Sequence, residues 1–215
     1  MLALGLLATV ADLQAGDFKY SSEGNSVTIT GYTGTGGVVN IPDAIDGVPV
    51  TRIESRSFVS CNRMTRVVIP DSVTYIGDQA FLGCKGLTTI LVGPLNSTYA
   101  SIDGVLFNKD KSLLIQCPGG KIGNYTIPDR VVTIGNGAFN SSHLSNITVG
   151  KGVTHIGDGA FEYCCGLSTL VFQGDAPVLG SSVFNLTPNT TIYYLPGSKG
   201  WESKFGDLPT EVWTP

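Results

Sequence analysis

The sequence predicts a repeat solenoid, built mainly of short β-strands, in which successive coils of the chain stack on one another. One observation is a motif that recurs at a spacing of roughly 22–24 residues, which is typical of solenoids. A second is composition: there are 28 glycines, and only 14% of residues are charged, against about 25% in an ordinary soluble domain. Many glycines together with many Val, Ile and Thr residues favour short strands joined by tight turns.

The motif Val-Thr-x-Ile-Gly-Asp-x-Ala-Phe occurs at residues 73–81 and 153–161, and a version one residue shorter occurs at 132–139. In the two full copies, a Cys, a Leu and a further aliphatic residue follow at the same offsets. A degenerate copy places its equivalents 23 residues before those of the first full copy: Ile53, Phe58, Cys61, Met64 and Val67. The repeats therefore extend over residues 50–172.

Each repeat is predicted to contain one strand, and the strands are expected at 64–69, 87–92, 144–149 and 167–172. The triplet Ile-Pro-Asp follows such segments at 69–71 and 127–129 and also occurs at 41–43. Proline cannot donate to a strand ladder, so it ends the strand. The first, fourth and sixth residues of each strand are expected to point inward, where each buried side chain contributes about 1.5–3 kcal/mol.

The pattern is interrupted at residues 95–130, where we predict one modified coil. Two apolar runs between Ser101 and Pro118 flank the polar segment Asn108-Lys109-Asp110-Lys111, which indicates a projecting hairpin. The polar segment is weakly similar to a calcium loop but lacks the required glycine and distal glutamate. A hairpin turn is the better interpretation.

The two ends of the chain differ from the repeats. Residues 1–15 are largely apolar, too few to span a bilayer, and fit a signal peptide or its remnant; a buried N-terminal segment is the alternative. Residues 16–49 are expected to form an N-terminal β cap and residues 173–215 a C-terminal cap, since an open stack needs its ends covered.

The repeats, with x-x-Ile-Gly-x-x-Ala-Phe-x-x-Cys-x-x-Leu-x-x-Ile in register at 76–87 and 156–167, resemble the BspA-like leucine-rich repeat family. The resemblance implies a right-handed coil with short parallel strands on one face, and turns and short helical segments on the other. It also implies a secreted or cell-surface protein that recognises other proteins or surfaces without catalysis. Ser57 in place of Ala and Ser142 in place of Cys are departures that concern local coil geometry.

Catalytic and cofactor chemistry are not indicated by the sequence. The two histidines, His143 and His155, have no nucleophile motif near them, and Asp78 and Asp158 are equivalent turn residues of different coils. Cys61, Cys84 and Cys164 share one repeat position and are expected to be buried free thiols, with no zinc-like spacing. We therefore predict no enzyme activity, no cofactor and no metal.

A ligand is expected to bind the strand face, as in other solenoids. A merely solvated sheet is the alternative, because Thr and Val suit any exposed strand. A face of about 350–450 Å² is smaller than the roughly 800 Å² per partner of a standard interface, so weak binding strengthened by several copies is expected. The candidate binding residues are Thr65, Arg66, Thr88, Thr89, Leu91, Gln116, Asn146, Thr148, Ser168, Thr169 and Tyr193.

The function predicted from these patterns is a secreted or cell-surface recognition module that binds a protein or surface ligand. The alternative is a structural protein of the envelope or matrix without a discrete ligand. A net charge of −4 and a pI near 5.0 disfavour binding to nucleic acid, and no span is expected in the mature chain.

Overall fold

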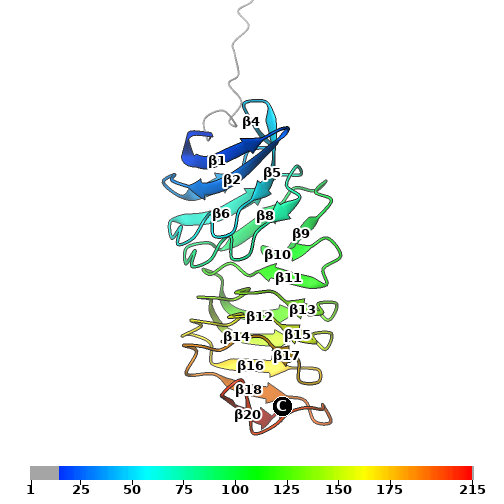
Figure 1. The fold of residues 1–215 in the computed structure, drawn as a ribbon. Helices are drawn as coiled ribbons and strands as arrows, with labels where there is room; N and C mark the ends of the chain where they lie inside the picture. The colour runs from blue at the N-terminus through cyan, green and yellow to red at the C-terminus, as the bar shows by residue number, and fades with distance from the viewer. Residues whose placement is uncertain (1–14, 215) are drawn as a thin grey trace, which may run out of the picture.

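The computed structural model describes residues 15–214, which form one elongated stack of coils (Figure 1). The described chain is almost entirely strand and turn, and its one helical element is the 3-10 turn η1 (Ala15–Asp17). No helix within residues 15–214 has the length and apolar character needed to cross a membrane. The predicted signal peptide, residues 1–15, lies outside the described residues except for Ala15.

The N-terminal half has strands on two sides of the stack. One side carries a sheet in the order β1-β2-β5-β4, with β7 also paired to β5, and the other carries β3-β6-β8. Within each coil the chain therefore crosses from one sheet to the other. The bounds are β1 (Phe18–Glu23), β2 (Ser26–Tyr32), β3 (Gly37–Asn40), β4 (Ala44–Ile45), β5 (Val48–Ile53), β6 (Met64–Ile69), β7 (Tyr75–Ile76) and β8 (Thr89–Val92).

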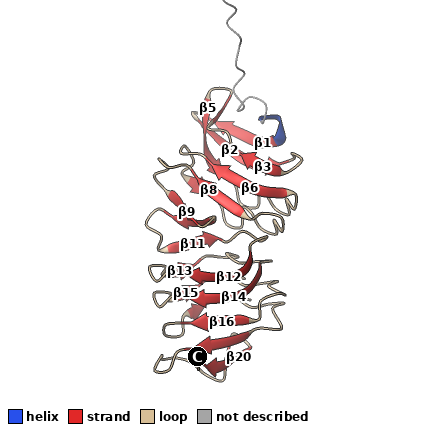
Figure 2. Cartoon of the chain, turned by 180° about the vertical axis from the view of Figure 1, so that it is seen from behind, coloured by secondary structure: helices blue, strands red, loops and turns tan. Residues whose placement is uncertain are grey.

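The C-terminal half repeats this arrangement with two six-stranded sheets, in the orders β12-β14-β16-β18-β20-β19 and β17-β15-β13-β11-β10-β9. From behind, β12, β14 and β16 lie in sequence beside β13 and β15 (Figure 2). The bounds are β9 (Tyr99–Ile102), β10 (Val105–Asn108), β11 (Leu113–Gln116), β12 (Ile122–Ile127), β13 (Thr133–Ile134), β14 (His143–Val149), β15 (His155–Ile156), β16 (Thr169–Phe172), β17 (Val178–Leu179), β18 (Thr191–Tyr194), β19 (Lys204–Phe205) and β20 (Leu208–Val212).

The parallel strands expected on one face are confirmed. β14 pairs with β16 and β16 with β18, in parallel and in register, and β6 pairs with β8 in the same way. The inward positions are those predicted: in β6, Met64, Val67 and Ile69 are fully buried.

A phenylalanine in each regular coil stacks on its equivalent in the next coil. Ring centroids are 5.2 Å apart for Phe58 and Phe81, and 5.0 Å for Phe139 and Phe161. Phe184 extends the second stack, 5.6 Å from Phe161. A buried aromatic contributes its own transfer free energy and that of ring pairing, so the Ala-Phe of the motif is the centre of the core.

The glycine of the Ile-Gly pair is required by the closeness of adjacent coils. A Cβ on Gly157 would lie 2.7 Å from the backbone nitrogen of Asn136 in the coil before, nearer than carbon and nitrogen atoms can pack. Only a residue without a side chain therefore fits at this position.

The short helical segments implied by the family resemblance are absent from the described coils, which use tight turns instead. Two positions between the sheets adopt left-handed backbone angles in coil after coil. Gln79 (φ 58°) and Gly83 (φ 68°) occupy them in one coil, and Gly159 (φ 57°) and Tyr163 (φ 60°) in another. A left-handed residue interrupts a right-handed helix, and two of them within five residues leave no room for a helical turn.

The modified coil is a three-stranded antiparallel meander, with β10 paired to both β9 and β11. The hairpin turn expected at Asn108–Lys111 lies between β10 and β11, but the expectation that the hairpin projects is wrong. The meander supplies one layer of the core, and four of its apolar side chains are fully buried within the stack: Val105, Leu106, Phe107 and Leu114.

Strand β10 separates two apolar interiors. Leu106 belongs to the cluster that runs from Phe18 to Ile90 and includes Tyr99, whereas its neighbours Val105 and Phe107 belong to the cluster that continues to Leu208. Successive side chains of a strand point to opposite faces, so one strand contributes to both interiors.

The stack continues for one coil beyond residue 172, where the C-terminal cap was expected to begin. β17 and β18 extend the two ladders in register, and Phe184 stacks on Phe161. The covering element is the β19–β20 hairpin, turned at Gly206 (φ 55°) and Asp207 (φ 71°), a two-residue turn with positive φ at both positions. At the other end, the antiparallel β1–β2 hairpin covers the first coil.

Candidate binding face

The meander divides the strand face into two areas. The turn at Asp103–Gly104 lies against β8: the amide of Ile90 donates to the carbonyl oxygen of Gly104 at 2.8 Å, and Gly104 is packed on Thr89. The predicted binding residues therefore fall into two groups. The first, called the N-terminal patch, is Thr65, Arg66, Thr88, Thr89 and Leu91. The second lies on β14, β16 and β18 and at the residue before β16, and is Asn146, Thr148, Ser168, Thr169 and Tyr193.

The placement of Gln116 on this face is wrong. Gln116 lies in β11, within the opposite sheet, and is only 4% exposed. Its Nε2 donates to the carbonyl oxygens of Cys117 at 3.0 Å and Ala138 at 3.3 Å. In the modified coil β12 takes the place on the strand face, so Asn124 and Thr126 stand where Gln116 was expected.

Outward side chains of the C-terminal sheet form three parallel rows, because alternate residues of aligned strands point to the same side. The rows are Asn124, Asn146, Thr169 and Thr191; then Thr126, Thr148, Val171, Tyr193 and Glu211; then Gln173, Leu195 and Trp213.

These rows border a groove of about 530 Å³, which we call the C-terminal groove. A volume of 300–1,000 Å³ is usual for small-molecule sites. The residues that line the groove are Asn124, Tyr125, Thr126, Asn146, Thr148, Thr169, Val171, Gln173, Tyr193, Leu195 and Trp213. None of them is Asp, Glu, Lys, Arg or His, and Glu211 is not part of the lining.

Two aromatic rings form one end of the C-terminal groove. Tyr193 and Trp213 meet edge to face, with centroids 5.3 Å apart and planes at 79°. Trp213 is held there by its backbone, whose amide donates to the carbonyl oxygen of Tyr194 at 2.8 Å. Both side chains are partly exposed, so aromatic surface is open to a ligand.

The polar atoms of the groove are partly engaged and partly free. Asn146 donates through Nδ2 to Oδ1 of Asn124 at 2.8 Å, and Ser168 donates to Oδ1 of Asn146 at 3.3 Å. Within residues 15–214, the side chains of Thr148 and Gln173 make no hydrogen bond, and the same holds for Thr126, Thr169 and Tyr193. Tyr125 also lines the groove and is buried, and this burial raises its pKa.

The N-terminal patch has a different character. Arg66 is exposed and lies between Val38 of β3 and Thr89 of β8 in the ladder. Leu91 is 37% exposed. This patch offers a cation and an exposed apolar side chain, whereas the lining of the C-terminal groove contains no charged side chain.

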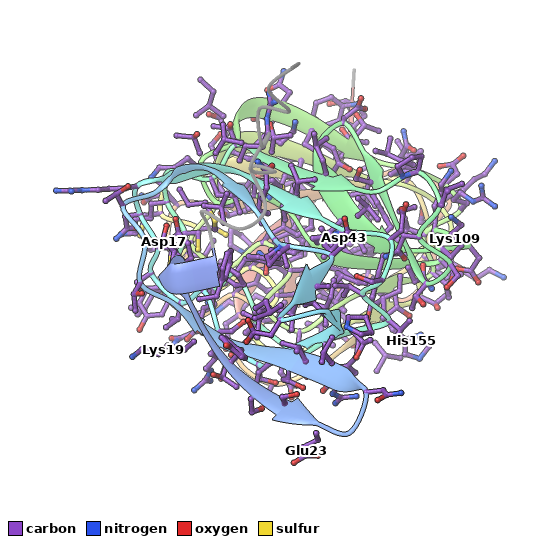
Figure 3. All side chains as sticks on the ribbon, turned by 90° about the horizontal axis from the view of Figure 1, so that it is seen from above. Asp17, Lys19, Glu23, Asp43, Lys109 and His155 are labelled. Atoms are coloured by element: carbon purple, nitrogen blue, oxygen red, sulfur yellow. The ribbon has the colours of Figure 1, made fainter. Side chains whose placement is uncertain are left out.

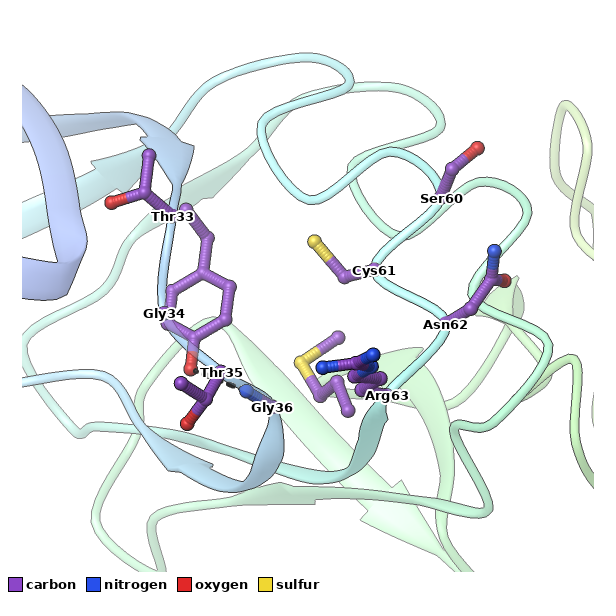
Figure 4. A pocket seen from close by; sticks show the side chains of 10 residues that line it. Thr33, Gly34, Thr35, Gly36, Ser60, Cys61, Asn62 and Arg63 are labelled. Carbon is purple, nitrogen blue, oxygen red and sulfur yellow. Dashed lines mark hydrogen bonds between the residues drawn. The ribbon is translucent and has the colours of Figure 1, made fainter.

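A second hollow, of about 360 Å³, lies between the loop at 32–36 and the turn at 60–64 (Figure 4). Cys61 faces it, and its pKa is lowered because the Cys84 thiol of the next coil can donate to the Cys61 thiolate. The five cysteines are free thiols. Cys84 and Cys164 are buried, as expected for their repeat position, but the expectation that Cys61 is buried is wrong, because it is only partly covered.

The other residues considered for chemistry lie apart. His143 Nδ1 is 2.6 Å from the carbonyl oxygen of Gly119, and His155 Nδ1 is 2.8 Å from the Thr154 hydroxyl. Among residues 15–214, no three His, Cys, Asp or Glu side chains are grouped as metal ligands. Seen along the stack, labelled ionisable side chains such as Lys109 and Glu23 lie around the periphery (Figure 3).

Several residues of the groove were not predicted from the sequence. Asn124 and Thr126 were missed although Ile127-Pro128-Asp129 marks the end of a strand, the signal used for the other coils. Trp213 and Gln173 were missed because residues after 172 were assigned to a cap.

Comparisons with known proteins identify the kind of repeat that forms these coils. Residues 117–200 match the family model of the BspA type leucine rich repeat region (6 copies). These residues are BspA-type leucine-rich repeats. The resemblance inferred from the sequence is thereby confirmed, and the BspA-type region includes the coil after residue 172. A comparison with curated proteins found no match.

Two solved structures share the fold. A leucine-rich repeat protein from Eubacterium ventriosum superimposes with a TM-score of 0.57 at 22% identity, covering 81% of this chain and 69% of its own. The leucine-rich repeat protein of T. pallidum gives a TM-score of 0.52 at 29% identity, covering 79% of this chain and 86% of its own. The leucine-rich repeat fold therefore extends over most of the chain.

Proposed function

We propose that this chain is a non-enzymatic recognition module of the secreted or cell-surface kind, which binds a protein or surface ligand through its strand face. The observation that carries the proposal is the C-terminal groove, where three rows of outward side chains and an aromatic pair border a hollow of about 530 Å³. The apolar segment at residues 1–15 and the BspA-type repeats support an extracellular location.

The proposed mode of binding is modest affinity at each copy, multiplied on a surface. The groove is smaller than a standard protein interface, and the meander separates it from the N-terminal patch. Several copies held near one another would bind a repetitive surface far more tightly than one copy binds a soluble ligand.

Binding to cells and to extracellular matrix proteins tests the proposal. Asn146→Ala with Tyr193→Ala removes groove contacts, Arg66→Ala with Leu91→Ala removes parts of the N-terminal patch, and His155→Ala with Tyr163→Asn changes residues away from the strand face. We expect the groove variant to lose most binding and the last variant to retain it. Unchanged binding in both strand-face variants would exclude this face.

The alternative is a structural protein of the envelope or matrix without a discrete ligand. It predicts self-association of the purified chain in the absence of any partner. Sedimentation over a range of concentrations distinguishes the two, because a recognition module stays monomeric without its partner whereas a structural protein associates with itself.

A further inference from the structure

We propose that the C-terminal groove binds neutral carbohydrate chains. This inference rests on the proposed function, since it names the ligand class of the same face. Its basis is the combination found in this groove: exposed aromatic rings, amide and hydroxyl side chains with free hydrogen-bonding capacity, and no ionised group in the lining.

The aromatic pair suits one surface of a sugar. A pyranose ring presents its C–H groups on its faces, and such a face packs against an aromatic ring through apolar contact and the negative π surface. The ring planes of Tyr193 and Trp213 meet at 79°. A sugar unit that packs on the face of one ring is therefore flanked by the edge of the other.

The polar side chains suit the other surface of a sugar. Each sugar hydroxyl both donates and accepts, and Asn, Gln and Thr side chains do the same. The amide of Gln173 and the hydroxyls of Thr148 and Thr169 make no hydrogen bond within the described chain, residues 15–214. They are free to replace the water that a sugar hydroxyl loses on binding.

The charge of the groove selects against other ligands. An acidic glycan carries carboxylates or sulfates, and the lining has no Lys or Arg to pair with them. A basic peptide likewise finds no carboxylate in the lining of the groove. The groove therefore favours an uncharged polar ligand.

The shape of the groove suits a chain of sugar units. Its side chains repeat from coil to coil, at the spacing of parallel strands, about 4.8 Å. A pyranose unit is of similar length, so successive units can meet equivalent Thr and Asn side chains on β12, β14 and β16.

The test uses the purified protein and a panel of immobilised polysaccharides. The neutral members are β-glucan, α-glucan, xylan, mannan and galactan, and the charged members are polygalacturonate, hyaluronate and heparin. We expect binding to at least one neutral member and none to the charged ones. Oligosaccharides from the member that binds are then titrated while tryptophan fluorescence is followed, since one of the chain's two tryptophans lies in the groove.

The variants decide where the sugar binds. Tyr193→Ala and Trp213→Ala are each expected to weaken oligosaccharide binding about tenfold or more. Thr148→Val combined with Thr169→Val removes two hydroxyls while keeping strand-forming residues, so it remains informative where loss of Trp213 unfolds the last coil. Tyr163→Asn removes an exposed aromatic ring elsewhere and is expected to bind as the unmodified protein does.

The outcomes separate the inference from the proposed function. If no neutral polysaccharide binds while attachment to cells or matrix proteins still depends on Tyr193, the carbohydrate inference is wrong and the recognition face stands. If a neutral glycan binds equally well to all variants, the groove is not its site. If neither glycan binding nor attachment depends on the strand face, both proposals fail.

Discussion

The Thr187 hydroxyl donates a hydrogen bond of 2.6 Å to the carbonyl oxygen of Phe161, and thereby does what cysteine does in earlier coils. The Cys164 thiol donates to the carbonyl oxygen of Phe139 at 3.0 Å, and the Cys84 thiol to that of Phe58 at 2.9 Å. A small buried donor at this position satisfies a carbonyl of the preceding coil. This requirement explains why Thr can replace Cys three residues after the phenylalanine.

Replacing Thr187 with Val is expected to lower the free energy of unfolding by about 1–3 kcal/mol. The hydroxyl also accepts from the amide of Cys164 at 3.1 Å, so Val leaves a buried donor and a buried acceptor without partners. Thr187→Cys is the matched control and should lose little, because a thiol serves the other coils. Urea unfolding measures both; equal losses in the two variants would contradict the role of the donor.

Replacing Ser57 with Ala is expected to stabilise the protein by about 1 kcal/mol. Within residues 15–214, Ser57 Oγ is the one buried side-chain oxygen or nitrogen without a hydrogen-bond partner. Ala occupies the equivalent position at Ala80, Ala138 and Ala160, where it is buried. Thermal unfolding measures the change, and Ala138→Ser should lower the melting temperature. A lower melting temperature for Ser57→Ala would show that the hydroxyl has a partner in solution.

Replacing Leu186 with Gly is expected to raise the free energy of unfolding by about 0.5–1 kcal/mol. Leu186 has a φ of 54°, a left-handed angle that is costly for a residue with a Cβ, and Gly83 fills the equivalent position with a φ of 68°. The gain exceeds the conformational entropy lost by glycine on folding. Leu95→Gly, at another exposed leucine, lacks this benefit and should destabilise. Denaturant unfolding of both variants gives the comparison.

Alkylation with iodoacetamide is expected to separate the cysteines into two groups. Cys84, Cys117 and Cys164 are buried, and burial raises the pKa of Cys164 to about 12. The thiolate is the reactive form, so these three should react only after unfolding, whereas Cys61 and the exposed Cys165 react in the folded protein. Peptide mapping by mass spectrometry identifies the labelled residues.

The pH dependence of the rate of Cys61 alkylation should show the effect of Cys84 on the pKa of Cys61. Because the Cys84 thiol can turn its proton from the Phe58 carbonyl to a Cys61 thiolate, and that hydrogen bond lowers the pKa of Cys61 below the usual 9.0, the thiolate forms at lower pH and the midpoint of the rate profile lies below 9. Cys84→Ala removes that bond and should return the midpoint upward. An unchanged midpoint in this variant would mean that the two thiols do not interact.

The regular coils could be predicted from the sequence because each inward position repeats with its chemistry intact. Ile-Gly, Ala-Phe, Cys and Leu recur in register, and in each case the structure gives the residue one role: a buried side chain, a close approach, or a donor to the previous coil. Periodicity therefore located the strands β6, β8, β14 and β16 of the strand face to within two residues, but not the second ladder, which contains β13, β15 and β17.

The modified coil could not be predicted in detail, because its residues keep the apolar character of a repeat strand but lie in the opposite sheet. Leu113–Gln116 is a short apolar run of the kind expected for a strand on the binding face, yet β11 joins the opposite ladder beside β13. Which ladder a strand joins depends on the meander around it, and local pattern does not encode that choice. The placement of Gln116 was wrong for this reason, and the groove residues on β12 were missed with it.

Strand β10, whose neighbouring side chains enter two different interiors, has a consequence for how such a protein changes length. Each half encloses its own apolar cluster, so a coil duplicated or deleted on one side leaves the packing on the other side closed. Variation in repeat number can therefore accumulate in either half independently. The groove and the N-terminal patch, which lie on opposite sides of β10, can diverge under separate selection.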